Sequence, residues 1–380
     1  MKYGKIVFNI AFFSMGIVGL SSLPNFAQTT NIAGEQLLQE VVNCVKNNIS
    51  NEKTGSLEVV ETASTQCIFK VIMLAPDGSI RSDAKDRMIA LIKTTGITLP
   101  KPSSQGEAVI KMQPIPDKKL LTIPVNLAGK SASFLLDTGA SNSIVDAQII
   151  EQLGVKGTSI PKELLSLMVV GENCGEINAT IHPLPVLAVE AAKVEGVTGM
   201  ALPKTAIPAN VGGVLGLDFI SGFDMIINPK TLDLKFLPST APVSDAIPLK
   251  GNMGIMTAEV KINGQGPFTF LVDTGAEIVV ISEKLSQQIS LDLTKAKSVE
   301  VKGFCGQEMG QQLTLNEVSM QQYQLSNIES VVLKSRVLEF LGVDGIIGQN
   351  FLNQYQQHWR FGARNELGYP DVGSLSLTGL

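Results

Sequence analysis

The chain has 380 residues, 44% of them hydrophobic and 17% charged, with 30 Lys and Arg against 35 Asp and Glu. This length suits two or three domains, and the apolar fraction excludes wholesale disorder. The net charge of −5 argues against nucleic-acid binding, which needs a basic surface. The two histidines, His182 and His358, are too few for a His-rich metal site and argue against a Ser-His-Asp triad, so we interpret both as structural. Acid–base chemistry is therefore expected to use carboxylates.

Residues 1–27 have the order of a secretory signal peptide. Lys2 and Lys5 flank the start of an apolar run over residues 6–20, and small residues follow up to Ala27. The run is shorter than the roughly 20 residues that span a bilayer, which favours a cleaved leader over a membrane anchor. We expect an exported protein, periplasmic or secreted, without membrane contact after cleavage. Export would place its four cysteines in an oxidising compartment.

Residues 28–98 are predicted to form a small α+β domain. The pattern predicts a helix over 34–46, a strand over 66–74, a Pro-Asp-Gly turn and a second helix from Ser82 to about Lys93. This order of elements resembles the C-terminal domains of TonB and TolA proteins. A Cys44–Cys67 disulfide would tie the first helix to the strand. The domain has no evident catalytic cluster, which favours a binding, spacer or pro-region role, and the Pro-rich residues 99–118 are predicted to be a linker.

The rest of the chain is predicted to be mainly β and contains itself twice. Phe-Leu-Leu-Asp-Thr-Gly-Ala ends at Ala140, and Phe-Leu-Val-Asp-Thr-Gly-Ala ends at Ala276. Each copy is followed by two apolar residues and a glycine, Gly216 in the first and Gly348 in the second. The offset between copies is 136 residues at the aspartates and 132 at the glycines. The near-constant offset predicts two lobes of one fold, residues 119–245 and 246–380.

The repeated motif places an acid where an apolar strand ends. The glycine of Asp-Thr-Gly then lets the backbone turn without a side-chain clash. Two such aspartates brought together by symmetry would share a proton, because neighbouring like charges cannot both ionise. The ionised member can then take a proton from water while the protonated member donates to a carbonyl. This arrangement is a hydrolytic device that needs no histidine and no metal.

These residues resemble the aspartic peptidases of the retroviral-protease type. Retropepsin-like enzymes work as two-fold dimers in which each subunit gives one Asp-Thr-Gly loop, whereas this chain carries both loops and looks like a single-chain pseudo-dimer. The resemblance implies two β-barrel lobes, a peptide or protein substrate, no cofactor and a monomer with internal pseudo-two-fold symmetry. By resemblance, the catalytic dyad is Asp137 and Asp273. The implied supporting residues of the two loops are Thr138, Gly139, Thr274, Gly275, Gly216 and Gly348.

Two departures from related enzymes lead to further expectations. Pepsin-like loops continue with Ser or Thr, whereas Ala140 and Ala276 follow here. Fewer hydrogen bonds to the ionised dyad should raise its pKa values, so we expect a mildly acidic optimum and not one below about pH 3. Ser141 and Glu277 stand where retroviral enzymes often have an acid that grips the substrate backbone. Because these two residues differ, the cleft should prefer an asymmetric peptide.

Two Cys-Gly pairs fall where the substrate-covering flaps of the resembled family would lie. Cys174 lies 37 residues after Asp137, and Cys305 lies 32 residues after Asp273. Both are expected at hairpin-like turns. We hypothesise a disulfide between them that joins the flap tips and locks the cleft, the alternative being two unrelated buried cysteines.

The leading functional hypothesis is an exported aspartic endopeptidase. One alternative is a non-catalytic envelope protein that holds a peptide in a peptidase-like cleft. Another is a structural envelope protein whose N-terminal unit docks a partner. Both aspartates are intact, which favours the enzyme.

Overall fold

The computed structural model describes residues 5–7, 32–49, 57–77, 81, 83–95, 101–160, 162, 165, 169–171, 173–252 and 254–380. Most of the predicted leader, residues 1–27, lies outside these ranges, as do Gly78 and Ser82. The described part of the leader is strand β1 (Lys5–Val7), which pairs in parallel with β20 (Lys297–Gly303) at a sheet edge. Among the described residues, the structure contains no helix with the length and apolar character needed to cross a membrane.

The N-terminal unit consists of three helices in its described residues, α1 (Ile32–Ile49), α2 (Leu57–Met73) and α3 (Ala84–Thr95). The predicted helices correspond to α1 and α3, but the strand predicted over 66–74 is wrong because α2 covers nearly all of it. The unit is therefore helical and not α+β, and it lacks the strand on which its resemblance to TonB and TolA domains depended. Ser64, Ile68 and Ile72 are buried at four-residue spacing, which is one face of a helix. A short apolar run fits a strand and a buried helix equally well.

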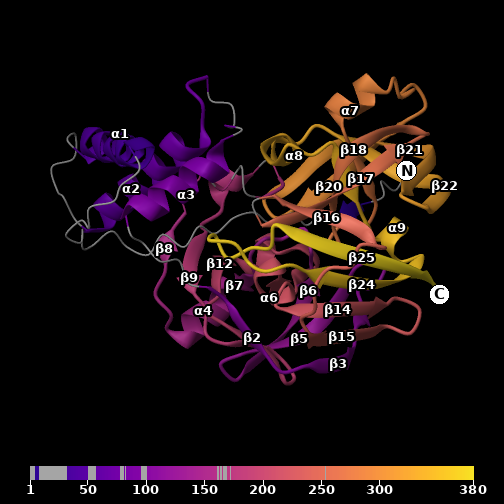
Figure 1. The fold of residues 1–380 in the computed structure, drawn as a ribbon, viewed down its shortest axis with the longest axis horizontal. Helices are drawn as coiled ribbons and strands as arrows, with labels where there is room; N and C mark the ends of the chain where they lie inside the picture. Colours follow the sequence, from indigo (N-terminus) through magenta and orange to yellow (C-terminus); the bar gives the residue numbers. More distant parts are fainter. Residues whose placement is uncertain are drawn as a thin grey trace.

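The predicted disulfide between Cys44 and Cys67 is present. It joins α1 to α2 with a Cα–Cα distance of 5.7 Å, so it links two helices and not a helix to a strand. Figure 1 shows the three helices beside β8 and β9 of the first lobe. Their buried side chains belong to one apolar cluster with residues of both lobes. Lys93 of α3 also forms an ion pair of 3.2 Å with Glu366 of the second lobe.

The described residues of the predicted linker are not an extended connection. Within residues 101–118, β2 (Ser103–Gln105) pairs with β11, β3 (Ala108–Lys111) with β15, and β4 (Gln113–Pro114) with β5. The three strands are short, and β2 and β3 lie at sheet edges. Proline is tolerated at such edges because no inner ladder needs its missing N–H group. The Pro-rich composition therefore marks edge strands here.

The first lobe is built on an 11-stranded sheet in the described residues. Its hairpin β5–β6 turns at Ala128 and Gly129, which both have positive φ, and the Asn126 side chain accepts a hydrogen bond of 2.9 Å from the Gly129 N–H group. The lobe also has short helices, α4 (Ala147–Leu153), η1 (Cys174–Glu176), η2 (Lys204–Ala206), η3 (Pro208–Asn210) and α6 (Leu217–Ile220). The strands of its sheet, besides β2 and β4, are β5 (Leu121–Leu127), β6 (Lys130–Leu136), β7 (Ile144–Asp146), β8 (Thr158–Ser159), β9 (Thr180–Pro183), β10 (Leu187–Val189), β11 (Ala192–Glu195), β12 (Thr198–Leu202) and β13 (Gly213–Leu215).

The second lobe repeats this plan. Its hairpin β17–β18 turns at Asn263 and Gly264, again both with positive φ, 136 residues after the equivalent turn. Its helices are α7 (Glu283–Gln288), α8 (Arg336–Leu341) and α9 (Gln349–Leu352). Its strands, besides β20, are β16 (Ile247–Asn252), β17 (Ile255–Ile262), β18 (Gln265–Val272), β19 (Val279–Ser282), β21 (Gly306–Met320), β22 (Tyr323–Leu333) and β23 (Gly345–Ile347).

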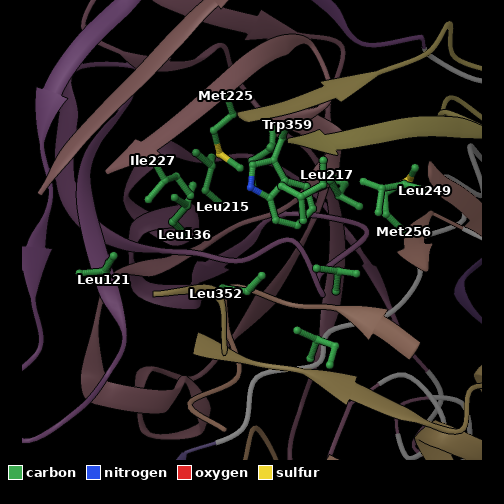
Figure 2. Close-up of a cluster of buried hydrophobic side chains, with 14 of the residues drawn as sticks. Leu121, Leu136, Leu215, Leu217, Met225, Ile227, Leu249, Met256, Leu352 and Trp359 are labelled. Atoms are coloured by element: carbon green, nitrogen blue, oxygen red, sulfur yellow. The ribbon is translucent and has the colours of Figure 1, made fainter. Parts of the chain in front are cut away.

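One continuous sheet joins the two lobes. Along it the order β16-β25-β24-β14-β15-β3 brings first-lobe and second-lobe strands together, and Met225 pairs with Trp359 where they meet. Figure 2 shows Trp359 beside Met225 and Leu217 in the apolar cluster at this junction. The shared sheet fixes the positions of the two lobes relative to each other. The strands not yet given are β14 (Phe223–Asn228), β15 (Asp233–Pro238), β24 (Tyr355–Phe361) and β25 (Val372–Gly379).

Candidate active site

Asp137 and Asp273 directly follow equivalent strands, β6 and β18. Each strand pairs in parallel with the short strand before the later glycine motif, so that Leu136 is opposite Leu215 and Val272 is opposite Ile347. The N–H groups of the two aspartates donate to the carbonyl groups of Leu215 (3.1 Å) and Ile347 (2.9 Å). The buried ladder therefore fixes the backbone of both acids and leaves their side chains to face each other.

The two carboxyl groups are fully buried. Oδ1 of Asp137 accepts hydrogen bonds from the N–H groups of Gly139 (2.8 Å) and Ala140 (3.1 Å), and Oδ1 of Asp273 accepts one from Gly275 (2.6 Å). The Oδ2 atom of each is buried without a hydrogen-bond partner among the described residues. Backbone donors thus orient one oxygen of each pair and leave the other available to a reacting group.

Gly139 and Gly275 bring each loop against the opposite carboxyl group. A Cβ atom on Gly139 would lie 2.5 and 2.6 Å from the two carboxyl oxygens of Asp273, and one on Gly275 would lie equally close to those of Asp137. Contacts this short are sterically forbidden, so the approach requires glycine on both sides. The structure therefore brings together the two aspartates that the sequence placed 136 residues apart.

Thr138 and Thr274 connect the two loops across the pseudo-two-fold axis. Each threonine N–H donates to the other hydroxyl group at 3.0 Å. The Thr138 hydroxyl donates to the carbonyl of Val272, and the Thr274 hydroxyl to that of Leu136, both at 2.9 Å. Both threonines are fully buried. Four hydrogen bonds therefore hold the loops in register, as the resemblance implied.

Gly216 and Gly348 lie behind the two loops. A Cβ on Gly216 would approach the carbonyl oxygens of Ala140 and Asn142 to 2.8 Å, and one on Gly348 would approach that of Ala276 to 2.8 Å. The residue after each glycine donates its N–H to the alanine of the Asp-Thr-Gly-Ala loop at 2.8 Å. These glycines thus let the later segment pass closely and brace each loop from behind.

Burial raises the pKa of both aspartates. For Asp137, burial is the largest cause and the neighbouring charge of Asp273 adds to it, while N–H donors act in the opposite direction. Burial also raises the pKa of Asp273, opposed by the hydrogen bond with Asp137 and by backbone N–H groups. Because the neutral acid is favoured, the pair retains a proton at a pH where an exposed carboxyl group would have lost it.

Ser141 and Glu277, the predicted substrate contacts, are both buried and have different partners. Glu277 forms an ion pair of 3.1 Å with Lys118 of the first lobe. Ser141 lies against Gly254 of the second lobe, where a Cβ on the glycine would be 2.7 Å from the serine Cβ. Lys118 and Gly254 are 136 residues apart, so the repeat offset would have identified them. The two halves of the site therefore differ, and the substrate-binding role of both residues stays a prediction.

Tyr369 is a site neighbour that the sequence did not reveal. It lies in the loop between β24 and β25, and its buried hydroxyl donates to Oδ1 of Asn142 at 2.6 Å. No motif marks it, because this loop has a much shorter counterpart between β14 and β15 in the first lobe. The second-lobe loop thus reaches the first-lobe half of the site.

The loops are supported by an acid in one lobe and an amide in the other. The Asp218 carboxylate accepts from the N–H (2.8 Å) and hydroxyl (2.7 Å) of Ser143. In the second lobe, Oδ1 of Asn350 accepts from the N–H of Val279 at 2.9 Å. Burial raises the pKa of Asp218 to about 6, although its hydrogen bonds with Ser143 oppose the shift.

The hypothesised disulfide between Cys174 and Cys305 is present, with a Cα–Cα distance of 4.7 Å. Cys305 lies in the hairpin turn between β20 and β21, as expected. Cys174 begins the 3₁₀ helix η1, so the hairpin turn expected there is wrong. Cys-Gly at a turn does not distinguish a hairpin from a short helix, because both are local reversals.

The histidines take no part in this arrangement. His182 has ring nitrogens 2.7 Å from the Thr180 hydroxyl and 3.1 Å from the Val155 carbonyl, and His358 lies on β24 of the shared sheet. Within the described ranges, no cluster of three or more His, Cys, Asp or Glu residues is placed to hold a metal ion.

Comparison with known proteins identifies the family. The sequence model described as gag-polyprotein putative aspartyl protease matches residues 123–222 and 258–354, together just over half of the chain. The chain belongs to this family and is a retropepsin-like aspartic peptidase with two tandem lobes. Among solved structures, it is similar to a retropepsin-like aspartic protease from Rickettsia conorii, with 21% identity, a TM-score of 0.24, and coverage of 35% of this chain and 92% of that one. A search of the curated proteins finds no match.

Proposed function

We propose that this protein is an endopeptidase that hydrolyses peptide bonds with water activated by Asp137 and Asp273. The observation that carries the proposal is the pair of buried Oδ2 atoms without hydrogen-bond partners among the described residues. Each belongs to a carboxyl group in contact with the glycine of the opposite loop. Unpartnered buried carboxyl oxygens are costly for folding, and their retention is typical of a functional site.

The mechanism follows from the shared proton. The ionised aspartate removes a proton from water as the water oxygen attacks the carbonyl carbon of the scissile peptide, and the protonated aspartate donates its proton to the carbonyl oxygen. The resulting tetrahedral diol gives up a hydroxyl proton to one aspartate, and the leaving nitrogen takes the other proton as the carbon–nitrogen bond breaks. The dyad then again holds one proton. The backbone donors on Oδ1 and the threonine hydrogen bonds keep both carboxyl groups in place throughout.

The test is cleavage of a peptide library between pH 4 and 7 by the wild type and by Asp137→Asn and Asp273→Asn. Each substitution keeps the shape of the side chain but removes the shared ionisation, so either one alone should abolish cleavage. Asp292→Asn is the matched control, because Asp292 is exposed and hydrogen-bonds only to Thr294 within its own turn. Binding of peptides without cleavage by the wild type would contradict the proposal and support a non-catalytic binding protein.

Mixing the two inactive variants tests whether one chain suffices. In a working monomer, the mixture stays inactive, because each chain has one altered loop. Cleavage restored by mixing would mean that loops from different chains pair.

We further propose that the protein is exported and works outside the cytoplasm. Two disulfides, Cys44–Cys67 and Cys174–Cys305, support this, since such bonds persist in oxidising compartments. N-terminal sequencing of the mature chain from fractionated cells should begin after Ala27. A cytoplasmic chain that retains Met1 would contradict the proposal.

A further inference from the structure

The site is covered by two segments, one from each lobe, which we call the roof. The second lobe contributes the tip of the β20–β21 hairpin, residues 303–306, and the first lobe contributes the described residues 169–171 and 173–177. The two segments form one small backbone-paired unit. The N–H of Cys305 donates to the carbonyl of Val170 at 3.0 Å, and the N–H of Asn173 donates to the carbonyl of Cys305 at 2.8 Å.

The two halves of the roof are in very close contact. A Cβ on Gly171, which has a φ of 136°, would lie 2.5 Å from the carbonyl carbon of Cys305, and Gly303 packs equally tightly against the backbone of Val170. The N–H of Gly171 also donates to the side chain of Glu308 at 3.1 Å. The Cys174–Cys305 disulfide adds a covalent bond to this contact. The roof is therefore a closed connection between the lobes and not two separate flaps.

The roof is also supported from outside by the N-terminal helices. Ile72 of α2 and Met88 of α3 are buried in the same apolar cluster as Val170 and Phe304 of the roof. Raising either half of the roof would expose this surface to water, which opposes opening.

With the roof bonded, the protein forms a closed ring around the aspartates. The two lobes are joined on one side by the shared sheet and on the other by Cys174–Cys305. Asp137 and Asp273 have no exposed surface inside this ring. A polypeptide can pass over the dyad only by entering through the ring, because the disulfide prevents the two flaps from separating to admit a chain from above.

We propose that the disulfide makes the site a tunnel, so that its substrates are extended, unfolded polypeptides that enter by a free chain end. This rests on the proposed peptidase function and names its substrate class. A loop within a folded protein has no free end near the cleavage point, and a cyclic peptide has none at all. Both are excluded from the oxidised protein even when they contain a cleavable sequence.

The test compares one cleavable sequence as a linear peptide and as a head-to-tail cyclic peptide large enough for that sequence to be fully extended. The wild type should cleave the linear peptide and fail to cleave the cyclic one. The double variant Cys174→Ser, Cys305→Ser should cleave both, because its roof can part. The matched control is Cys44→Ser, Cys67→Ser, which removes the other disulfide and should retain the wild-type preference.

Two results overturn the proposal while the peptidase function stands. Equal cleavage of the two peptides by the wild type would show that a free end is not needed. Cleavage of neither by the wild type, but of both by the Cys174→Ser, Cys305→Ser variant, would show that the bonded roof is a complete lock.

Two further measurements keep the proposal testable if a protein is unsuitable. If the roof variant does not fold, the wild type alone is given linear peptides with a small folded domain fused to one end or to both ends. Loss of cleavage only when both ends are blocked supports a tunnel, and cleavage of the doubly blocked peptide contradicts it. If no peptide is cleaved at all, the peptidase proposal fails. Fluorescence anisotropy then tests the tunnel, which requires binding of the linear but not the cyclic peptide.

Discussion

Replacing Thr274 by alanine tests how strongly the two loops depend on each other. The Thr274 hydroxyl accepts from the N–H of Thr138 and donates to the carbonyl of Leu136. Alanine leaves both backbone groups buried without a partner, at about 1–3 kcal/mol each, so the variant should lose roughly 2–6 kcal/mol of unfolding free energy. Thr274→Ser keeps both hydrogen bonds and removes one buried methyl group, which costs about 1 kcal/mol.

Trp359 provides the assay. It is the single tryptophan of the chain and is fully buried where the lobes meet, so its fluorescence during urea unfolding reports on the shared core. The alanine variant should unfold at much lower urea than the serine variant and should lose cleavage activity, because the dyad is no longer held in register. Equal urea midpoints for Thr274→Ala and Thr274→Ser would refute the reasoning, because hydrogen bonding would then contribute nothing.

Three further outcomes are expected. Gly275→Ala should abolish cleavage with the fold retained, because its Cβ would overlap the carboxyl group of Asp137, whereas Gly379→Ala, where a Cβ meets nothing within 4 Å, should match the wild type in the same peptide assay. Asp218→Asn should remove a fall of roughly 3 kcal/mol in unfolding free energy between pH 4 and 7, because burial raises the pKa of Asp218 from 3.8 to about 6 and the native state therefore binds the proton more tightly than the unfolded chain; an unchanged slope in urea titrations would argue against this, and Asn350 shows that an amide fits the equivalent place. The raised pKa of the two catalytic aspartates should place the maximum of the cleavage–pH profile in the mildly acidic range or higher, and a maximum below about pH 3 would contradict this assignment.

The sequence by itself determined the centre of the molecule. The repeated Phe-Leu-Leu/Val-Asp-Thr-Gly-Ala motif and the later glycines predicted two equivalent lobes, and the structure brings Asp137 and Asp273 together as predicted. This succeeded because the motif is local. An apolar strand, an acid and a glycine turn need no distant partner to be recognised, and the constant offset carried the long-range information.

Tertiary structure decided the parts where sequence pattern is ambiguous or silent. The apolar run over 66–74 fits a strand or a buried helix, and only packing within the three-helix unit selects the helix. The Pro-rich residues 101–118 read as a linker, yet sheet edges elsewhere in the chain recruit them as strands. Tyr369 and the bonded roof depend on contacts between residues more than 100 positions apart. Such contacts follow from how the lobes meet, which no local pattern encodes.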